Sequence, residues 1–432
     1  MKIRSLLLGS VAAAGLSTGA FAADLGVLTS LDVCDALGLS GLTISSDTNC
    51  LQITGGVKYE FNWGDYETAT PLVVTGAGTF NIPAPGGAPG AELDWSSKVE
   101  AWIKFVATAD SDFGPAKAVI KIKEEQKTVI VDETYVSGPG GGVVFDEAYV
   151  SIGDSTVIMA GKKGTIMNKG DDVPLNFLGL FNSEKVDAGV NWDVSLPDGG
   201  HVIQIVSDLG NGVSVGAGLE NLNDIVPASA GTAVGVISYA GDGIAAHLTV
   251  AAGGVLDGTI ENWGLHAGFS GTFDIVKFVA AVAADSSGYW NGLASASATF
   301  DMFTIAVSAE AVQNNATSGG GNVGLDYGFG GSVSAAVTDG VTINLGGRWY
   351  RDAGGANDAY QVAAQLVAAV TETVTLTGEV GLYGNTAGPL SVYYGAAQVA
   401  WAPGGGFTSS LKGEVYSNGA YKATFKAAKT FE

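Results

Sequence analysis

The stretch from Leu51 to Trp63, which reads LQITGGVKYEFNW, decides the fold. Its odd-numbered positions are apolar, aromatic or glycine, whereas its even-numbered positions are polar apart from Gly56. Alternation without a break over this length is the pattern of a β-strand whose two faces meet different surroundings. We therefore predict a long strand that begins at Leu51.

The same alternation returns toward the end of the chain, in residues 341–350, 374–382 and 421–431. Between these segments and Leu51 we count about 20 strands of similar length, joined by turn residues. An even number is needed if the two ends of the sheet are to meet on the same side and close it, so we predict 16 to 20 strands. Closure would also remove the exposed edges of the sheet.

Alternation also occurs in soluble sandwiches, and three further features favour a membrane-spanning barrel. Aromatic residues gather at strand ends, where membrane interfaces would lie. Short and long connections alternate, as they do when short turns lie on one side of a membrane and long loops on the other. Each segment has one apolar face and one polar or small face. The short turns are predicted at Asp274, Asp301, 338–340, 371–372 and 403–406, and the long loops at 64–94, 314–322, 351–358 and 384–389.

Composition agrees with this fold class, an all-β transmembrane antiparallel β-barrel over residues 51–432. The chain has 65 glycines and only 15% charged residues, and amphipathic helical patterns are almost absent. A soluble chain of this size would carry about a quarter charged residues. The formal net charge of −23 argues against nucleic acid as a partner.

The N-terminal region divides into two parts. Residues 1–22 have two early cations, a short apolar core and the Ala20-Phe21-Ala22 cleavage pattern, so they predict a signal peptide for export. Residues 23–50 then form a short periplasmic segment. It contains Cys34 and Cys50, which we expect to form a disulfide in an oxidising compartment, because C-x-x-C spacing and nearby histidines for a redox or metal pair are lacking.

At these cysteines the chain resembles the alphaproteobacterial outer-membrane porin family. The resemblance rests on Cys34-Asp35-Ala36-Leu37-Gly38 and on Cys50 running directly into the first strand. A second similar segment is 147–153 followed by 157–162, in which Lys162 replaces the arginine of the family pattern. The chain departs from many outer-membrane barrels by ending one residue after its last aromatic, Phe431.

The resemblance implies a general diffusion porin. Such a protein is a homotrimer of water-filled barrels, usually of 16 strands, in the outer membrane of a Gram-negative bacterium. Its partners would be membrane lipid, lipopolysaccharide and small hydrophilic solutes, with no nucleic acid and no cofactor. The third external loop of the family folds into the barrel. Here that loop is 164–186, with Asp171, Asp172 and Glu184 as constriction acids. The alternative is an ordinary solvated surface loop.

The distribution of cations predicts a basic wall opposite this loop. Nine of the 20 Lys and Arg residues lie between Lys98 and Lys169, whereas residues 186–347 hold 15 acids and a single cation, Lys277. Alternation places most of the wall on the lumen face, and the alternative is that the lysines contact headgroups at strand ends. The predicted wall consists of Lys58, Lys98, Lys104, Lys117, Lys121, Lys123, Lys162, Arg348, Lys412, Lys422 and Lys426. The excess of acids predicts a mild preference for cations.

Other functions receive less support from the sequence. His201, His247 and His266 are scattered, and neither a catalytic triad nor a metal-binding pattern stands out, so we expect no enzyme activity, no catalytic residues and no metal. A substrate-specific channel would need an aromatic track, for which Trp102, Tyr350 and Tyr416 are candidates. A non-conducting surface or adhesive barrel is the remaining alternative.

Overall fold

The computed structural model describes residues 32–86, 93–131, 134–138, 140, 142–170, 172–183, 189–226, 230–314, 324–352, 357–386 and 390–432. The predicted signal peptide and the predicted acids Asp171 and Glu184 lie outside these residues. No helix within the described ranges has the length and apolar character needed to cross a membrane.

Strands make up almost all of the regular secondary structure that is described. The helical elements are α1 (Asp32–Ala36) and the short 3-10 helix η2 (Val255–Asp257). The strands are β1 (Thr43–Ser45), β2 (Asn49–Asp65), β3 (Thr68–Thr75), β4 (Gly78–Ala84), β5 (Asp94–Ala109), β6 (Ala116–Val131), β7 (Thr134–Ser137), β8 (Val144–Gly153), β9 (Thr156–Lys163), β10 (Gly200–Gly210), β11 (Val213–Glu220), β12 (Thr232–Gly241), β13 (Ile244–Gly253), β14 (Asn262–Phe273), β15 (Val276–Asp285), β16 (Trp290–Phe300), β17 (Phe303–Asn314), β18 (Gly324–Thr338), β19 (Val341–Asp352), β20 (Asn357–Ala369), β21 (Val374–Asn385), β22 (Ser391–Gly404), β23 (Phe407–Tyr416) and β24 (Tyr421–Phe431).

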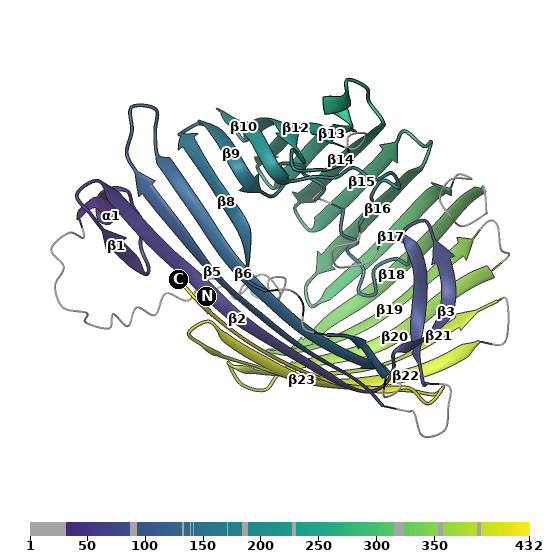
Figure 1. The fold of residues 1–432 in the computed structure, drawn as a ribbon. Helices are drawn as coiled ribbons and strands as arrows, with labels where there is room; N and C mark the ends of the chain where they lie inside the picture. The colour runs from purple at the N-terminus through teal and green to yellow at the C-terminus, as the bar shows by residue number, and fades with distance from the viewer. Residues whose placement is uncertain are drawn as a thin grey trace.

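Twenty of these strands form a closed antiparallel barrel, in the order β2, β5, β6 and then β8 to β24. The barrel closes where β24 pairs with β2, for example at Phe425 opposite Phe61. Figure 1 shows the strands arranged around an open interior, with the C-terminus beside β2. The count of about 20 strands from the sequence is therefore confirmed. The barrel has more strands than the 16 that are usual in the porin family that the sequence resembles.

Of the remaining strands, β1 makes a short antiparallel pairing with β2, and β7 makes one with β6. Strands β3 and β4 pair with each other and form a separate hairpin. This hairpin contacts β19, β20 and β21 and lies beside them in Figure 1. It occupies most of the connection predicted as a long loop between residues 64 and 94.

The two ends of the barrel differ as the sequence predicts. At one end, here called the short-turn end, neighbouring strands are joined tightly. Four of these turns have a non-glycine residue in the left-handed region, namely Asn211, Asp242, Asp274 and Asp301, with φ of 52–53°. Asn and Asp tolerate this conformation better than other residues because their short polar side chains bond locally. All the long connections leave the opposite end, here called the long-loop end.

Aromatic side chains form a row near each end of the outward face. Trp63 packs edge-on against Tyr421 at the long-loop end, with ring centroids 5.6 Å apart. Trp401 packs against Phe407 at the short-turn end, with centroids 5.7 Å apart. Apolar side chains such as Val380 and Leu411 lie exposed between these rows. An apolar band between two aromatic rows is the outer surface of a membrane barrel.

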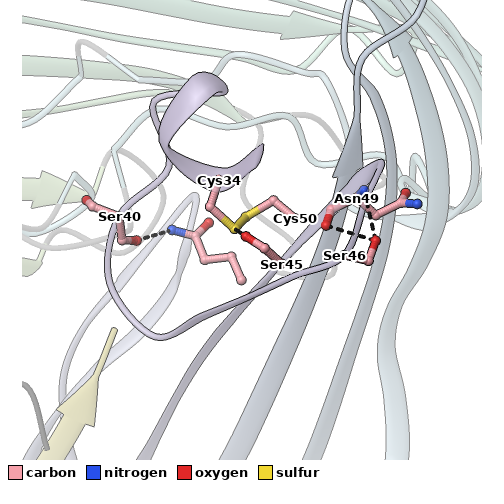
Figure 2. The surroundings of a disulfide bond; sticks show 7 residues. Cys34, Ser40, Ser45, Ser46, Asn49 and Cys50 are labelled. Carbon is pink, nitrogen blue, oxygen red and sulfur yellow. Dashed lines mark hydrogen bonds between the residues drawn. A yellow bond between two sulfur atoms is a disulfide. The ribbon is translucent and has the colours of Figure 1, made fainter. Parts of the chain in front are cut away.

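The Cys34–Cys50 disulfide is present, as predicted, and closes a 16-residue separation at the short-turn end. Figure 2 shows the bridge between α1, which contains Cys34, and the first residues of β2, with Ser45 donating a hydrogen bond to the Cys34 sulfur at 2.9 Å. The Gln52 side chain donates to the Ser40 carbonyl at 3.0 Å. The disulfide thus fastens residues 34–45 to β2, which also pairs with β5 and β24.

Replacing both cysteines with serine is expected to loosen this segment without opening the barrel. Cross-linking a loop of about 15 residues contributes about 3 kcal/mol in the chain-entropy model. The barrel itself keeps the pairings of β2 with β5 and β24. Limited proteolysis should therefore cut between Leu37 and Thr48 in the double variant while the barrel core stays intact. Equal resistance of both proteins would contradict this role.

Candidate functional site: the lumen and its inward loop

The connection between β9 and β10 spans residues 164–199, and its described parts, 164–170, 172–183 and 189–199, lie inside the barrel. They are called the inward loop below. Its backbone is bonded to lumen-facing side chains of seven strands. In one of these bonds the wall donates, since the Arg348 guanidinium donates to the Leu180 carbonyl of the loop at 2.9 Å. In the others a loop N–H donates to a wall side chain: Ile166 and Gly199 to Glu220 (both 2.9 Å), Asn168 to Thr249 (3.1 Å), Leu175 to Ser295 (2.9 Å), Phe177 to Ser332 (2.9 Å), Asn182 to Glu310 (3.0 Å), Asn191 to Asn291 (3.0 Å) and Asp193 to Asp285 (2.6 Å). The solvated surface loop is therefore the wrong reading, and the inward loop extends 13 residues beyond the predicted end at Val186.

Glu220, the last residue of β11, fastens both ends of the inward loop. One carboxylate oxygen accepts from the Ile166 N–H and from the Gln204 amide, at 2.9 and 2.8 Å, and the other accepts from the Gly199 N–H at 2.9 Å. The side chain is completely buried. A buried carboxylate is stable only when such donors replace its hydration. Glu220 therefore holds the two ends of the inward loop together at the wall.

Asp285 and Glu310 hold the middle of the loop in the same way. One oxygen of Asp285 accepts from the Asp193 and Val194 N–H groups, at 2.6 and 3.2 Å. The two oxygens of Glu310 accept from the Asn182 and Ser183 N–H groups, at 3.0 and 2.7 Å. These acids belong to the strongly acidic stretch 186–347. Part of that acid excess therefore binds loop backbone instead of lining the channel.

Arg348 faces the lumen, as alternation predicts, but the inward loop and the β3–β4 hairpin cover it. Its Nε donates to Gln361 at 2.8 Å, and its guanidinium lies 4.8 Å from the Phe80 ring centre and 4.2 Å from that of Phe181. Only 8% of the residue is exposed. The prediction that Arg348 lines the pore is therefore corrected: it joins loop, hairpin and wall.

Asp172 is likewise turned toward the wall beneath the loop. Its carboxylate accepts from the Val190 N–H at 3.2 Å and lies 3.7 Å from Nε2 of His266. His266 is stacked on His247, and their ring nitrogens are 2.9 Å apart. Both histidines are buried. The predicted role of Asp172 as an acid facing the lysine wall is corrected by this orientation.

Wall glycines allow the loop to lie close to the sheet. A Cβ atom at Gly264 would come within 2.7 Å of the Trp192 ring, and one at Gly330 within 2.6 Å of the Asn176 side chain. Strand glycines commonly mark such close approaches. The high glycine content of the sequence thus has a second use beyond turns.

On the opposite wall, formed by β24, β2, β5, β6 and β8, the lumen face carries the predicted lysines together with acids. Strand pairing makes this face continuous with the face that carries Arg348 and Glu310. Most of these lysines are paired with carboxylates. The pairs are Lys58–Glu100 (3.4 Å), Lys123–Glu100 (3.2 Å), Lys98–Glu125 (3.0 Å), Lys104–Glu147 (2.9 Å), Lys121–Asp146 (2.6 Å) and Lys426–Glu60 (2.9 Å). We call this array the ion-pair wall.

The sequence analysis missed the acids of the ion-pair wall. Alternation alone could have found them, because Glu60 and Glu100 share the parity of Lys58 and Lys98 in the same strands. Cross-strand pairs of opposite charge then follow from the antiparallel register. The lumen wall is therefore mixed in sign, whereas a basic wall was predicted.

Three other predicted lysines lie on the same face. Lys412 pairs with Glu414 at 2.8 Å. The Lys422 ammonium lies 4.3 Å above the ring of Tyr66, just beyond β2. Burial raises the pKa of the Tyr66 hydroxyl to about 12, so this ring stays uncharged at physiological pH. Lys117 lies near the short-turn end and shares its face with Lys121.

Lys162 does not belong to the lumen wall, and this prediction is corrected. It pairs in register with Ala148 of β8, which pairs with the outward-facing Ile120 of β6. Its ammonium donates to the Phe145 carbonyl at 2.6 Å. The neighbouring Lys163 is the residue that faces inward, 5.5 Å from the Tyr149 ring centre.

Removing one acid from the ion-pair wall should shift ion selectivity toward anions. Glu100 accepts from both Lys58 and Lys123, so Glu100→Gln leaves one extra positive charge in the lumen. At about 8 Å in water a unit charge changes an ion's energy by roughly 0.5 kcal/mol, or about twofold in partitioning. Reversal potentials in a salt gradient measure this shift. Glu124→Gln is the control, since Glu124 faces outward, and an equal shift in both variants would contradict the assignment.

Tyrosines form a stacked group on the lumen face of β21 to β23. Tyr394 lies 5.0 Å from Tyr383 and 6.0 Å from Tyr416 between ring centres. The Tyr394 hydroxyl donates to Glu379 at 2.8 Å and accepts from Gln361 at 2.9 Å. Of the predicted aromatic track, Tyr416 belongs to this group, whereas Tyr350 is completely buried. Trp102 lies elsewhere, against Lys121 of the ion-pair wall.

No protein-family model matches the chain. In sequence it is 27% identical over 161 residues to the porin Omp2b of Brucella canis, a match that covers 35% of this chain and 39% of the relative. The chain therefore matches about two fifths of the length of its curated relatives. This local match supports the resemblance to alphaproteobacterial porins that the N-terminal cysteine motif indicated.

Several solved structures align with most of this chain at low identity. OccK11 of Pseudomonas aeruginosa is 9% identical, with 88% of this chain and 96% of that chain covered and a TM-score of 0.47. A mutant of the Rh. blastica porin is 13% identical, with 88% and 100% covered and a TM-score of 0.39. The anion-selective porin of Comamonas acidovorans is 13% identical, with 89% and 100% covered and a TM-score of 0.36. Since these scores are below 0.5, the fold rests on the strand pairings described above.

Proposed function

We propose that this chain, as a relative of the alphaproteobacterial porins, is a channel of the bacterial outer membrane through which small hydrophilic solutes and ions diffuse passively. The observation that carries the proposal is the inward loop, whose backbone is bonded to side chains of seven barrel strands. A loop held across the interior narrows a barrel. The channel would work by size and charge, without catalytic residues.

Charge in the lumen supports a weak preference for cations. The ion-pair wall is nearly balanced in sign, because most of its lysines have a carboxylate partner. The preference itself rests on the acid excess of residues 186–347, of which Glu220, Asp285 and Glu310 bind loop backbone and so do not line the channel. Rings and clusters of side-chain charge set ion selectivity in pores. We also propose that three copies of this chain form a homotrimer, which is surrounded by outer-membrane lipid and lipopolysaccharide.

Swelling of liposomes that contain the refolded protein tests this function. Neutral sugars of increasing size should enter at rates that fall steadily with molecular size, with no sugar saturating the flux. Empty liposomes and liposomes with heat-unfolded protein serve as controls. A correctly folded barrel that admits no solute would contradict the proposal and leave the surface or adhesive barrel as the better account.

A solute-selective channel is the second candidate, and the stacked tyrosines Tyr383, Tyr394 and Tyr416 favour it. Aromatic faces beside Glu379 and Gln361 offer both stacking and hydrogen bonds to a polar solute. In this case one class of solute should block the ion current at low concentration. Tyr394→Ala should then abolish the block while the current in salt alone stays.

A further inference from the structure

The strand β2 is longer than the strand that closes the barrel on it. β2 runs from Asn49 to Asp65, whereas β24 pairs with it only from Asp65 as far as Gly55, which lies opposite Phe431. On its other edge β2 pairs with β5 along almost its whole length. Residues 50–53 of β2 therefore extend toward the short-turn end with one edge that β24 does not cover.

The disulfide-bonded segment covers this edge. β1 pairs in antiparallel register with residues 50–52 of β2, beginning with Thr43 opposite Gln52. The Ile53 N–H donates to the Leu42 carbonyl at 2.9 Å, which extends the pairing by one residue. The disulfide fastens this segment to the start of β2. The part of β2 that β24 leaves uncovered is thus paired by the segment that precedes it in the chain.

β24 and β1 lie end to end along the same edge of β2. The pairing of β24 ends opposite Gly55 and that of the segment begins opposite Ile53, so only Thr54 lies between them. Both strands are antiparallel to β2 and therefore run in the same direction. A Cβ atom at Gly41 would lie 3.1 Å from the backbone of Glu432, so the two strands meet without a gap. Two distant parts of the chain form one continuous line of pairing.

Without β1, β24 could close the barrel in a second register. If β24 lay two residues farther toward the short-turn end, Phe431 would face Ile53 and Tyr421 would face Trp63. Every residue of β24 that is now paired would still have a partner in β2. A shift of two residues also leaves each side chain on its own face of the sheet, because side chains alternate with a period of two. Alternation therefore does not distinguish the two registers.

Charges along this seam separate the two registers only in part. In the observed register Lys426 lies opposite Glu60, and their side chains are 2.9 Å apart. In the shifted register Lys426 would lie opposite Lys58, although Glu60 would remain its diagonal neighbour. Cross-strand charge pairs change the balance between two arrangements by at most about fivefold. A further device is needed to make one register exclusive.

We infer that the disulfide-bonded segment is a register stop for closure of the barrel. β1 and β2 are neighbours in sequence, so their pairing and the disulfide form from local contacts, whereas β24 is distant in sequence and pairs with β2 late. β24 then meets residues 50–53 already occupied and can advance no farther than Gly55. This inference goes beyond the proposed function and does not depend on whether the barrel conducts.

Engineered cysteines report the register. Val57 and Lys429 are partners in the observed register, so Val57→Cys with Lys429→Cys should form a disulfide there. Val57→Cys with Ala427→Cys should form one only in the shifted register. In the observed register these two residues are displaced by about 6.6 Å along the strand, which puts them beyond the reach of a disulfide. Barrels refolded in detergent and recognised by heat-modifiable migration are oxidised, and mass spectrometry identifies the cross-linked peptides.

The two reporters are compared with and without the native disulfide. With it, only the Val57–Lys429 reporter should cross-link. In Cys34→Ser with Cys50→Ser both reporters should cross-link, and adding Lys58→Ala should raise the shifted fraction by up to about fivefold, because like charges no longer meet. Lys58→Ala with the native disulfide is the matched control and should keep the observed register. The observed register alone in every protein would overturn the inference, as would equal yields of the shifted cross-link with and without the native disulfide.

Discussion

Replacing Glu220 with alanine is expected to release both ends of the inward loop and to raise the single-channel conductance. The variant leaves the Ile166 and Gly199 N–H groups and the Gln204 amide without their buried acceptor. Leaving such groups unsatisfied costs about 1–3 kcal/mol each. Both ends of the loop lose their common anchor, so the loop should sample positions away from the wall. Single-channel recordings should show larger and noisier current steps, and trypsin should cut after Lys163 and Lys169.

Two variants control for this experiment. Glu220→Gln keeps the volume and one acceptor oxygen, so its conductance should lie between those of the wild type and the alanine variant. Asp208→Asn removes a lumen-facing carboxylate of β10 that accepts from the Gly210 N–H of its own turn at 2.8 Å, and it should leave the loop in place. Unchanged current and protease resistance in Glu220→Ala would show that the Glu220 carboxylate does not hold the loop in place.

Arg348→Ala is expected to detach the loop and the β3–β4 hairpin together. The side chain fills the space between Phe80 of the hairpin and Phe181 of the loop and donates to the Leu180 carbonyl. Removing one partner of a buried charged network costs about 3–5 kcal/mol. Hydrogen exchange should therefore speed up in two peptides, 72–82 and 178–183, although they lie far apart in the sequence.

Arg348→Lys should rescue little, because an ammonium cannot donate in the fixed directions of a guanidinium or stack as well on two rings. Lys412→Ala, which removes a solvent-accessible lumen cation, serves as the control and should leave both peptides protected. Faster exchange in the loop peptide alone would mean that the hairpin is held by its own contacts and that Arg348 does not couple them.

The fold could be predicted because one period governs most of the chain. Alternation from Leu51 to Trp63 identifies a strand with two faces, and repeated alternation gave the count of about 20 that the pairings confirm. The turns at Asp274 and Asp301 were also visible, since these residues favour left-handed backbone at tight connections. The disulfide followed from two cysteines in a chain that the sequence predicts to be exported.

The lumen chemistry was less accessible for reasons that differ from residue to residue. Alternation correctly predicted that Arg348 faces the lumen, but the burial of its side chain depends on contacts with the inward loop, such as Leu180, which is 168 positions away. Residues 157–163 are apolar at both parities and end in two adjacent lysines, so only the pairing of Lys162 with Ala148 shows which lysine faces outward. The inward loop has no period at all. Its position is set by carboxylates such as Glu220, whose partners are backbone groups that no sequence pattern marks.

Single-channel conductance of the refolded protein in a planar bilayer, recorded with a salt gradient, tests the central claim most directly. The account predicts stepwise currents in groups of three, with a reversal potential that indicates a weak preference for cations. The steps should become larger when Glu220→Ala frees the inward loop. A correctly folded, heat-modifiable barrel that passes no current would contradict the account, because the proposed channel requires an open path for ions past the inward loop and the β3–β4 hairpin.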